Sequence, residues 1–404
     1  MSLPLAGIRI LAVEQYGAGP FGTQHLADMG AEVIKIENPH DGGDVSRSVG
    51  PHFLSNGDSL FFEGFNRNKK SIRLDLKDAD GIKVLHQLLK DAHVLFNNLR
   101  GDLPVKLGLT YSDVSHIRKD IVCVHLSAYG REGSRASWPG YDYLMQAEAG
   151  YLSLTGEPDG PPSRFGLSMV DLMTGTTAAL GIVSALLGSR RTGVGMDVDV
   201  SLFDVAMHNL AYLATWYLNA GHMTTRAPYS AHPSLVPSQL YRTSDGWIFI
   251  MCNKEKFWPI MAKLMNHPEW STRPEYRTFA DRLKNRESFN EEVGAVMQTD
   301  TTDNWMIKFA GKVPAAPVYN VAQALDNPFV KERCDIVAGK RLLADDQHAS
   351  TPREVKSVAS PLRFSSSQMP AQAAPAMGQD TQSVLIQAGL TSEQIQFLRD
   401  KGVV

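Results

Sequence analysis

Cysteine is scarce in this chain, with three residues among 404. Cys123, Cys252 and Cys334 are far apart and odd in number, which argues against structural disulfides and for a reducing compartment. Their spacing matches no common metal site. We therefore expect a cytoplasmic protein without a resident metal ion.

An excess of positive charge is also lacking. The chain has 40 Lys and Arg residues against 43 Asp and Glu residues, for a net charge of -3. Nucleic-acid-binding proteins usually carry a basic surface, so nucleic acid is excluded as a partner. Hydrophobic residues make up 43% of the chain and charged residues 21%, which is typical of a globular protein. A length of 404 residues exceeds one ordinary core and predicts two domains.

No hydrophobic run is long enough to indicate a membrane. The amino-terminal residues carry no basic region followed by a long apolar core, so we expect no secretory signal. The most apolar run, residues 172–187, is shorter than a membrane-spanning helix and is interrupted by Gly and Thr. This run predicts a buried helix, and we expect no membrane partner.

One carboxylate, Asp171, lies at the start of this apolar run. Ala, Leu and Ile favour the helix, Ser168 or Asp171 is a candidate N-cap, and Gly188 is the predicted end. The positive end of the helix dipole is expected to keep the carboxylate ionised. Asp at such a place is most often only a helix cap. The alternative is functional, because an ionised carboxylate in a partly dry pocket acts as a base or a nucleophile.

The beginning of the chain predicts a βαβ unit. Residues 8–13 and 31–37 have the pattern of buried strands, and a helix between them follows the glycine-rich turn at 17–22. The turn reads G-x-G-x-x-G and Glu37 ends the second strand, as in dinucleotide-binding proteins. Pro20 removes one of the amide donors that a phosphate would use. A nicotinamide cofactor, the phosphates of another nucleotide, and a plain tight turn therefore all stay open.

Strands and helices continue to alternate in the first half of the chain. The further predicted strands are residues 72–76, 93–96, 121–126 and 195–201, with a helix at 80–90. This alternation predicts an α/β fold with a mostly parallel sheet, in which ligands bind at the carboxyl ends of the strands. Arg67, Lys69 and Lys70 form a cationic cluster that either pairs with phosphates or is a solvated strand entry.

The composition changes near residue 226. Prolines punctuate residues 226–237, and a hairpin is predicted around Asp245-Gly246. The predicted division is a large domain at 1–225, a small α+β domain at 226–325, and a C-terminal segment at 326–404 that returns to the large domain.

Taken in order, these segments resemble the family III CoA-transferases, the group of formyl-CoA transferase and carnitine CoA-transferase. The resemblance covers nearly the whole chain. Its motifs are Ala18-Gly-Pro20, Leu26 to Glu37, Asn66 to Ile72, Asn98-Leu-Arg100, Tyr141-Asp with Gln146-Ala, Asp171-Leu-Met-Thr-Gly175, and Ala374 to Gly378. No one of these motifs is specific, but the ordered set is.

The resemblance implies a Rossmann-like large domain, a smaller α+β domain and an interlocked homodimer. It also implies that Asp171 is the catalytic residue and that the glycine-rich turn holds coenzyme A in place of a dinucleotide. The implied CoA-binding residues are Ala18, Arg67, Lys69, Asn98, Leu99, Arg100 and Tyr129, with the cations suited to the phosphates of CoA. No permanently bound cofactor is expected, because the CoA thioester is the substrate.

The chain departs from the family pattern at several positions. The family often has Phe where Leu99 stands and Pro-Gly after Arg100, where this chain has Gly-Asp. One group of members has Lys at the position of Ser127, and a glycine-rich loop of formyl-CoA transferase is replaced by residues 251–255. These differences bear on the acid substrate and on loop closure, and they leave Asp171 unaffected.

The implied reaction moves CoA from an acyl-CoA donor to a small carboxylic acid. Asp171 attacks the thioester to give a mixed anhydride, CoA thiolate then forms an aspartyl-CoA thioester, and the acceptor acid reverses the sequence. Succinyl-CoA and a small dicarboxylate are the first expectation, from Lys254 and Lys256 near the predicted pocket lid and from common habits of the family. The two lysines also have the plain interpretation of surface charges.

An α-methylacyl-CoA racemase is the nearest alternative. Racemases resemble this chain but carry His where Tyr141 stands, and Tyr is a poor base near neutral pH. His125 is close in sequence, but a histidine in a strand is more often a hydrogen-bonded core residue. A CoA-binding protein without turnover and a nicotinamide oxidoreductase are the alternatives from other classes.

Overall fold

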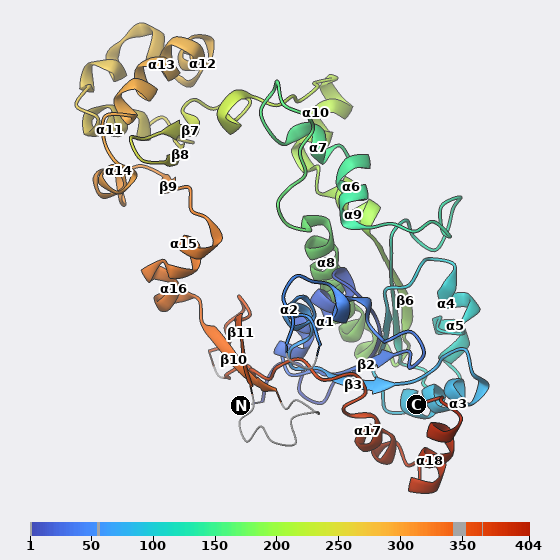
Figure 1. Cartoon of the computed structure of the whole chain (residues 1–404). Helices are drawn as coiled ribbons and strands as arrows, with labels where there is room; N and C mark the ends of the chain where they lie inside the picture. The colour runs from blue at the N-terminus through green and yellow to red at the C-terminus, as the bar shows by residue number, and fades with distance from the viewer. Residues whose placement is uncertain (1, 55–56, 342–352, 366) are drawn as a thin grey trace. The chain divides into compact units, whose positions relative to one another are not determined.

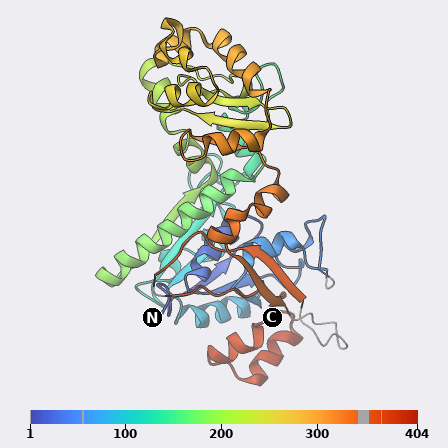
Figure 2. The same ribbon diagram turned by 90° about the vertical axis from the view of Figure 1, so that its left-hand side faces the viewer.

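The computed structural model describes residues 2–54, 57–341, 353–365 and 367–404. The chain divides into two compact units, which Figures 1 and 2 show in two views. Unit 1 combines residues 1–149, 166–211 and 333–404, and unit 2 combines residues 150–165 and 212–332. The small domain predicted at 226–325 lies inside unit 2.

Unit 1 is built on a six-stranded parallel sheet. Its strands are β1 (Arg9–Val13), β2 (Glu32–Glu37), β3 (Lys70–Arg73), β4 (Val94–Asn97), β5 (Val122–Ser127) and β6 (Met196–Ser201). They lie in the order β3-β2-β1-β4-β5-β6, and each neighbouring pair is parallel. The predicted α/β class with a parallel sheet is confirmed. β3 begins earlier than the predicted 72–76, because Lys70 already pairs with Ile34 of β2.

The helices of unit 1 lie between the strands of the sheet or follow its last strand (Figure 1). They are α1 (Ala18–Asp28), α2 (Leu60–Asn66), α3 (Ala79–Leu89), α4 (Leu103–Lys106), α5 (Tyr111–Val114), α6 (Asp142–Glu148), α8 (Met169–Thr192), α9 (Leu202–His208), α17 (Thr381–Gln387) and α18 (Ser392–Asp400). A 3-10 turn spans Val45–Ser48. β10 (Ile336–Arg341) and β11 (Arg353–Val358) form a separate antiparallel pair.

The sheet has a different helical layer on each face. Successive strand residues point to opposite faces, so each strand contributes to both layers. Leu11, Ile34 and Leu95 belong to an apolar core that also contains side chains of α3, α17 and α18. On the other side α1 and α8 pack against each other and against the strands (Figure 1).

The apolar run after Asp171 forms α8, which spans Met169–Thr192. Gly188 lies inside the helix, and Gly193, in the left-handed conformation at φ 70°, ends it. The predicted end at Gly188 is wrong, because the chain offers two glycines and the left-handed cap forms at the second. Within the described part of the chain, α8 is the one helix whose length and apolar composition would suffice to cross a membrane. Half of its apolar stretch is buried inside the protein.

Unit 2 combines a small antiparallel sheet with short helices. Its strands are β7 (Ser238–Arg242), β8 (Trp247–Met251) and β9 (Ala315–Pro317), in that order. Its helices are α7 (Tyr151–Leu154), α10 (Ala211–Ala220), α11 (Phe257–Leu264), α12 (Phe279–Lys284), α13 (Arg286–Met297), α14 (Thr302–Phe309), α15 (Val321–Asp326) and α16 (Pro328–Arg333). Short 3-10 turns lie at Pro228–Ser230, Pro268–Thr272 and Pro274–Tyr276. The predicted hairpin at Asp245-Gly246 is confirmed by the antiparallel pairing of β7 with β8.

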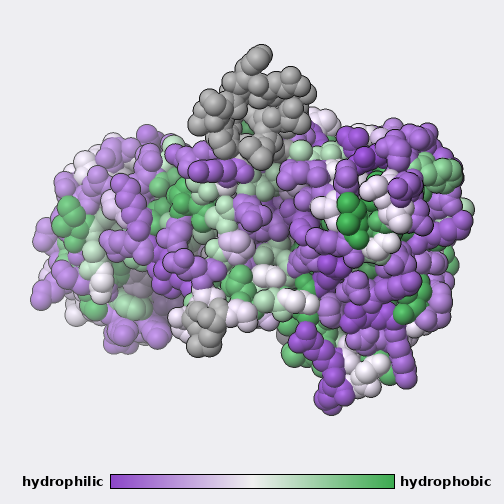
Figure 3. All heavy atoms as spheres, turned by 90° about the horizontal axis from the view of Figure 1, so that it is seen from below, coloured by the Kyte–Doolittle hydropathy of each residue, from purple (hydrophilic) through white to green (hydrophobic). Residues whose placement is uncertain are grey.

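The surface seen in Figure 3 is mainly hydrophilic, with apolar side chains in small separate patches. Such a mixture of polar and apolar side chains is typical of the surface of a globular chain.

Candidate active site

A pocket of about 200 Å³ lies at the carboxyl ends of β1, β4 and β5 in unit 1. The strand order reverses between β1 and β4, and ligands of open α/β sheets bind at such a point. The lining residues are Gln15, Tyr16, Gly17, Ala18, Val45, Asn98, Leu99, Arg100, Leu126, Ser127, Ala128, Trp138, Pro139, Gly140, Tyr141, Asp171 and Leu202. The pocket therefore brings together two features that the sequence analysis singled out, the glycine-rich turn and Asp171.

Close packing of α1 on α8 brings Asp171 to this pocket. A Cβ atom at Gly22 would lie 2.5 Å from the carbonyl oxygen of Gly175, and one at Gly175 would lie 2.4 Å from that of Ala18. Only glycine permits the two helices to approach so closely. At the start of α1, a Cβ at Gly17 would lie 2.7 Å from Asp171 Oδ2. The carboxylate therefore sits directly against the amino-terminal turn of α1.

Asp171 is the third residue of α8 and is 6% exposed. Ser168 is the N-cap residue, and its side chain makes no capping hydrogen bond. The interpretation of Asp171 as a helix cap is therefore not supported. Its backbone N–H donates to Asp142 Oδ2 at 2.9 Å, and Gln146 Nε2 donates to Asp142 Oδ1 at 2.6 Å. These bonds from α6 fix the first turn of α8 and leave the Asp171 carboxylate facing the pocket.

Burial raises the pKa of Asp171 to about 7, and the nearby charge of Asp142 adds to the effect. The expectation that the helix dipole tends to keep the carboxylate ionised is therefore corrected. A dipole at an exposed helix end contributes about 0.3–1 kcal/mol, whereas loss of water costs a buried carboxylate far more. Asp171 is poised between its charged and neutral forms near neutral pH, as suits an acid, a base or a nucleophile.

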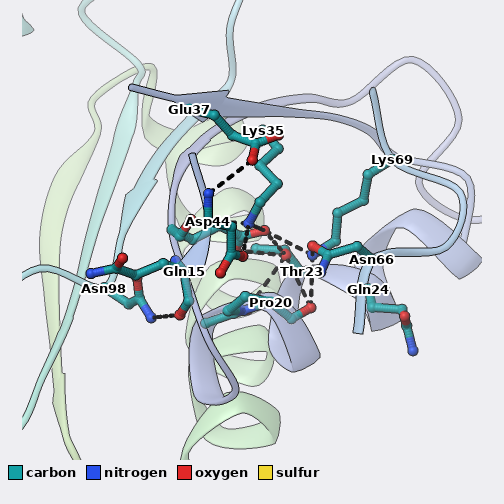
Figure 4. Close-up of polar contacts among 12 residues, drawn as sticks. Gln15, Pro20, Thr23, Gln24, Lys35, Glu37, Asp44, Asn66, Lys69 and Asn98 are labelled. Carbon is teal, nitrogen blue, oxygen red and sulfur yellow. Dashed lines mark hydrogen bonds and ion pairs between the residues drawn. The ribbon is translucent and has the colours of Figure 1, made fainter. Parts of the chain in front are cut away.

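The loop between β1 and α1 is held from three sides (Figure 4). Asn98 Oδ1 accepts the N–H of Gln15 at 2.9 Å, and Asn98 Nδ2 donates to the Gln15 carbonyl at 2.7 Å. Asp44 Oδ1 accepts the N–H of Tyr16 at 2.9 Å. Lys35 Nζ donates to the carbonyl of Glu14 at 2.9 Å and lies 2.7 Å from Asp44 Oδ2. The position of the pocket wall is thus set by side chains from β2, from the segment before Val45 and from the end of β4.

Lys69, predicted to bind phosphate, is fully buried in an internal network (Figure 4). Its Nζ donates to Glu14 Oε1 at 2.7 Å, to the carbonyl of Pro20 at 2.8 Å and to Asn66 Oδ1 at 3.0 Å. Burial lowers the pKa of Lys69 to about 8. This ammonium group holds the start of α1 from inside and does not line the pocket beside Asp171.

Arg67 has a similar internal role. Its guanidinium binds the carboxylate of Asp28, with Nη2 at 2.6 Å from Oδ2, and Nη1 donates to the carbonyl of Val358 at 2.7 Å. Arg67 and Lys69 therefore both form buried ion pairs, and neither lines the pocket beside Asp171. Their contact with the phosphates of CoA stays a prediction. In the sequence, a cationic cluster that faces buried carboxylates looks the same as one that faces a ligand.

Residues 5–381 of the chain match the sequence profile of CoA-transferase family III. The chain belongs to this family. A mouse (Mus musculus) succinyl-CoA:glutarate CoA-transferase is 35% identical over 344 residues, which cover 83% of this chain and 78% of the mouse protein. A succinyl-CoA:mesaconate CoA-transferase of Haloarcula hispanica is 30% identical over 395 residues, which cover 96% of each chain. A crystal structure of a CAIB/BAIF family protein from Brucella suis superposes with a TM-score of 0.83 at 28% identity, covering 96% of this chain and all of that one.

Among the residues that the family resemblance singled out, Ala18, Asn98, Leu99 and Arg100 line the pocket with Asp171. Asn98 acts through the backbone of Gln15, whereas Arg100 lies at the exposed edge. Arg100 Nη2 donates to Asp102 Oδ2 at 3.0 Å, so the carboxylate of Asp102 partly neutralises the charge of Arg100.

Tyr129 lies behind the pocket wall. Its ring packs against Trp138, a lining residue, with 6.1 Å between the ring centroids. Its hydroxyl donates to Glu148 Oε2 at 3.0 Å. Tyr129 is therefore placed to support Trp138, and the structure shows no direct lining role for it.

A second pocket of about 250 Å³ adjoins the first, since Gln15 and Leu99 line both. Its apolar part contains Ile36, Leu74, Leu76, Leu103 and Leu107, and Lys77 lies at its edge. Reasoning from the sequence did not single out these residues. The available signal was the alternating segment after β3, in which Leu74 and Leu76 stand at the carboxyl end of a strand.

His125 was the candidate base for the racemase alternative. In the structure it is a core residue. It lies on β5 with 1% exposure, Nδ1 2.8 Å from Asn97 Nδ2 and Nε2 2.8 Å from Asp197 Oδ1. It does not line the pocket. Tyr141 lines the pocket, and none of the residues that line this pocket is a histidine.

Proposed function

We propose that this protein transfers CoA from an acyl-CoA donor to a small carboxylic acid, with Asp171 as the nucleophile. The observation that carries the proposal is the place of Asp171. Its carboxylate is buried against the first turn of α1, at the carboxyl edge of a sheet, in a chain of CoA-transferase family III. Transfer without hydrolysis requires that the energy of the thioester is kept in a covalent intermediate shielded from water.

The proposed chemistry follows from this geometry. An oxygen of Asp171 attacks the thioester carbonyl, the C–S bond breaks, CoA leaves as a thiolate, and a mixed anhydride remains. The thiolate then attacks the carbonyl of Asp171, releases the donor acid and leaves an aspartyl-CoA thioester, which the acceptor acid opens by the reverse route. The amides of Ala18 and Gly19, at the unpaired start of α1, are suited to the developing oxyanions, whereas Pro20 has no N–H to offer.

The two adjoining pockets suit the two ends of CoA. The strand order is that of Rossmann-like nucleotide-binding sheets, and the second pocket offers an apolar surface for an adenine ring. Arg100 and Lys77 stand at the edges of these pockets as partners for phosphates. The reactive thioester then reaches Asp171 past Leu99 and Gln15, which line both pockets.

For the substrates we propose succinyl-CoA and a small dicarboxylate. The support comes from relatives named for succinyl-CoA with glutarate or mesaconate, although an acetyl-CoA:oxalate CoA-transferase of Acetobacter aceti is 33% identical over 80% of this chain. Lys254 and Lys256 belong to unit 2, between β8 and α11.

We also propose a cytoplasmic homodimer. The support is apolar surface on two helices: Leu180 and Leu187 of α8 are 67% and 68% exposed, and Tyr212, Tyr217 and Leu218 of α10 are also exposed. Large apolar side chains that are exposed on a helix favour association with another chain. We further propose that the two copies interlock. Measurement of chain exchange between labelled dimers tests this, because interlocked chains should exchange slowly.

The test is a transfer assay with succinyl-CoA and acetyl-CoA as donors and glutarate, mesaconate and oxalate as acceptors. The proposal predicts a new acyl-CoA with at least one pair and loss of transfer in Asp171→Asn. The same samples in deuterated water report on the racemase alternative. Exchange at an α-carbon without CoA transfer would overturn the proposal.

A further inference from the structure

Tyr16 has a backbone conformation that is costly for its residue type. Its φ is 69°, in the left-handed region that glycine and asparagine adopt most readily. For a bulky side chain this conformation costs on the order of 1–3 kcal/mol and persists only where the surroundings enforce it. It lies one residue before Gly17, which would have adopted such a φ without cost.

A buried ion pair enforces this conformation. Asp44 Oδ1 accepts the N–H of Tyr16 at 2.9 Å and that of Ser46 at 2.8 Å, and the side chains of Asp44 and Lys35 are both 0% exposed. Burial by itself lowers the pKa of Lys35 and raises that of Asp44, but the attraction between the two, with the charges of Glu14 and Glu37 near Lys35, outweighs it. Both groups are therefore charged, and a fixed carboxylate holds the strained turn.

The strained turn directs the Tyr16 ring to the wall of the Asp171 pocket. The ring centroid lies 5.4 Å from that of Phe61 and 6.1 Å from that of Tyr141, and Tyr16 and Tyr141 both line the pocket. Among the described residues, the Tyr16 hydroxyl makes no hydrogen bond with the protein. A fixed aromatic ring thus presents an unused donor beside the carboxylate.

On the basis of the proposed function, we propose that Tyr16 is a further catalytic residue. Its hydroxyl donates a hydrogen bond to the oxygen of the thioester carbonyl, while Asp171 attacks the carbon of that carbonyl. When Asp171 Oδ attacks, the electron pair of the C=O bond moves onto that oxygen, and it returns as the C–S bond breaks. The phenol donates during this step and keeps its proton, so no proton is transferred. A donor fixed before the reaction stabilises the oxyanion without a cost of reorganisation.

The electrostatics of the pocket keep the phenol in its donor form. Burial and then the negative charge of Asp171 raise the pKa of Tyr16 above its usual value, with smaller contributions from Tyr143 and Tyr141. The hydroxyl therefore stays protonated across the neutral range in which Asp171 ionises. It is suited to donate to an oxygen and unsuited to act as a general base.

The test is Tyr16→Phe, which keeps the ring, its packing and the left-handed turn. In steady-state transfer with saturating donor, the proposal predicts a fall in kcat of about 100-fold or more, with KM for the donor changed by less than about threefold. In a single turnover, rapid quench and mass spectrometry should show the same slowing of adduct formation on Asp171. Tyr111→Phe is the matched control, because the Tyr111 hydroxyl donates to the carbonyl of Lys119 outside the pocket, and it should keep wild-type rates.

Each outcome has a defined reading. An active wild type with a Tyr16→Phe enzyme of equal kcat would overturn the catalytic role and leave the CoA-transferase proposal standing. A raised KM with unchanged kcat would also overturn it, because the hydroxyl would then only bind substrate. A wild type that transfers CoA between none of the acids tested would overturn both proposals.

Discussion

Asp142 accepts the backbone N–H of Asp171 at 2.9 Å and brings a second carboxylate beside the proposed nucleophile. The arrangement has two opposite effects. The hydrogen bond fixes the start of α8, whereas the negative charge of Asp142 adds to burial in raising the pKa of Asp171 to about 7. This relationship gives the site a pH dependence that a single substitution tests.

The nucleophile must be ionised, so kcat/KM should fall as the pH drops below about 7. In Asp142→Asn the amide oxygen still accepts the Asp171 N–H, but the repulsion between two carboxylates is gone. The pKa of Asp171 should fall, and the acid limb of the pH profile should move to lower pH. The measurement is kcat/KM from pH 5 to 9 for both proteins, with KM followed separately. An acid limb at the same pH in both would show that Asp142 does not act on Asp171 through its charge.

Adding a methyl group to a glycine of α8 should destabilise the protein at Gly175, which contacts α1, and not at Gly188. In Gly175→Ala the new Cβ would lie 2.4 Å from a backbone carbonyl of α1, and such overpacking costs about 1–3 kcal/mol. In Gly188→Ala, the matched control, the nearest atom is Met196 Cε at 3.8 Å, so the better helix propensity of Ala should raise stability by about 0.5–1 kcal/mol. Urea unfolding compares the two. Equal effects of both substitutions would contradict the proposed packing.

Lys35→Met should destabilise the protein by about 3–5 kcal/mol, because it leaves Asp44 buried without its cation. Lys83→Met is the control, since the Lys83 side chain is 76% exposed and its pair with Asp80 lies in solvent, where an ion pair contributes little to stability. Chemical denaturation measures both. A Lys35→Met protein as stable as Lys83→Met would mean that Asp44 does not depend on Lys35.

Arg100 and Asp102 form an ion pair at the rim of the pocket. A phosphate of CoA is expected to compete with Asp102 for the Arg100 guanidinium. Arg100→Ala should raise KM for the acyl-CoA, and the salt dependence of KM should become weaker as one phosphate partner is lost. Asp102→Asn frees the guanidinium and should lower KM. Initial rates at low and moderate salt test both variants. Parallel changes in KM for the two substitutions would argue against a phosphate contact of Arg100.

Much of unit 1 could be predicted because its signals are local. The β-branched runs, the glycine-rich turn and the apolar run after Asp171 each correspond to an element of the predicted type, although the ends of α8 and β3 differ from the predicted ones. The hairpin at Asp245-Gly246 followed in the same way from its turn residues. Patterns of this kind are sufficient for the order of the elements, whereas the catalytic assignment of Asp171 came from the family resemblance.

The charged interior was not predictable to the same degree. Arg67 and Lys69 were assigned to phosphates because a cationic run in the sequence does not reveal that Asp28 and Glu14 face it across the fold. Lys35 offered a usable signal, since a charge within the apolar run of β2 requires a buried partner. The conformation of Tyr16 offered none, because a positive φ is normally indicated by Gly or Asn.

The central claim is that Asp171 carries the transferred group, and trapping the covalent enzyme tests it most directly. Wild-type protein and Asp171→Asn are incubated with succinyl-CoA, treated with hydroxylamine, digested and analysed by mass spectrometry. The account predicts a hydroxamate on the peptide that contains Asp171 in the wild type and none at that position in the variant. An active wild-type enzyme without modification at Asp171, or with the hydroxamate on another carboxylate, would contradict it.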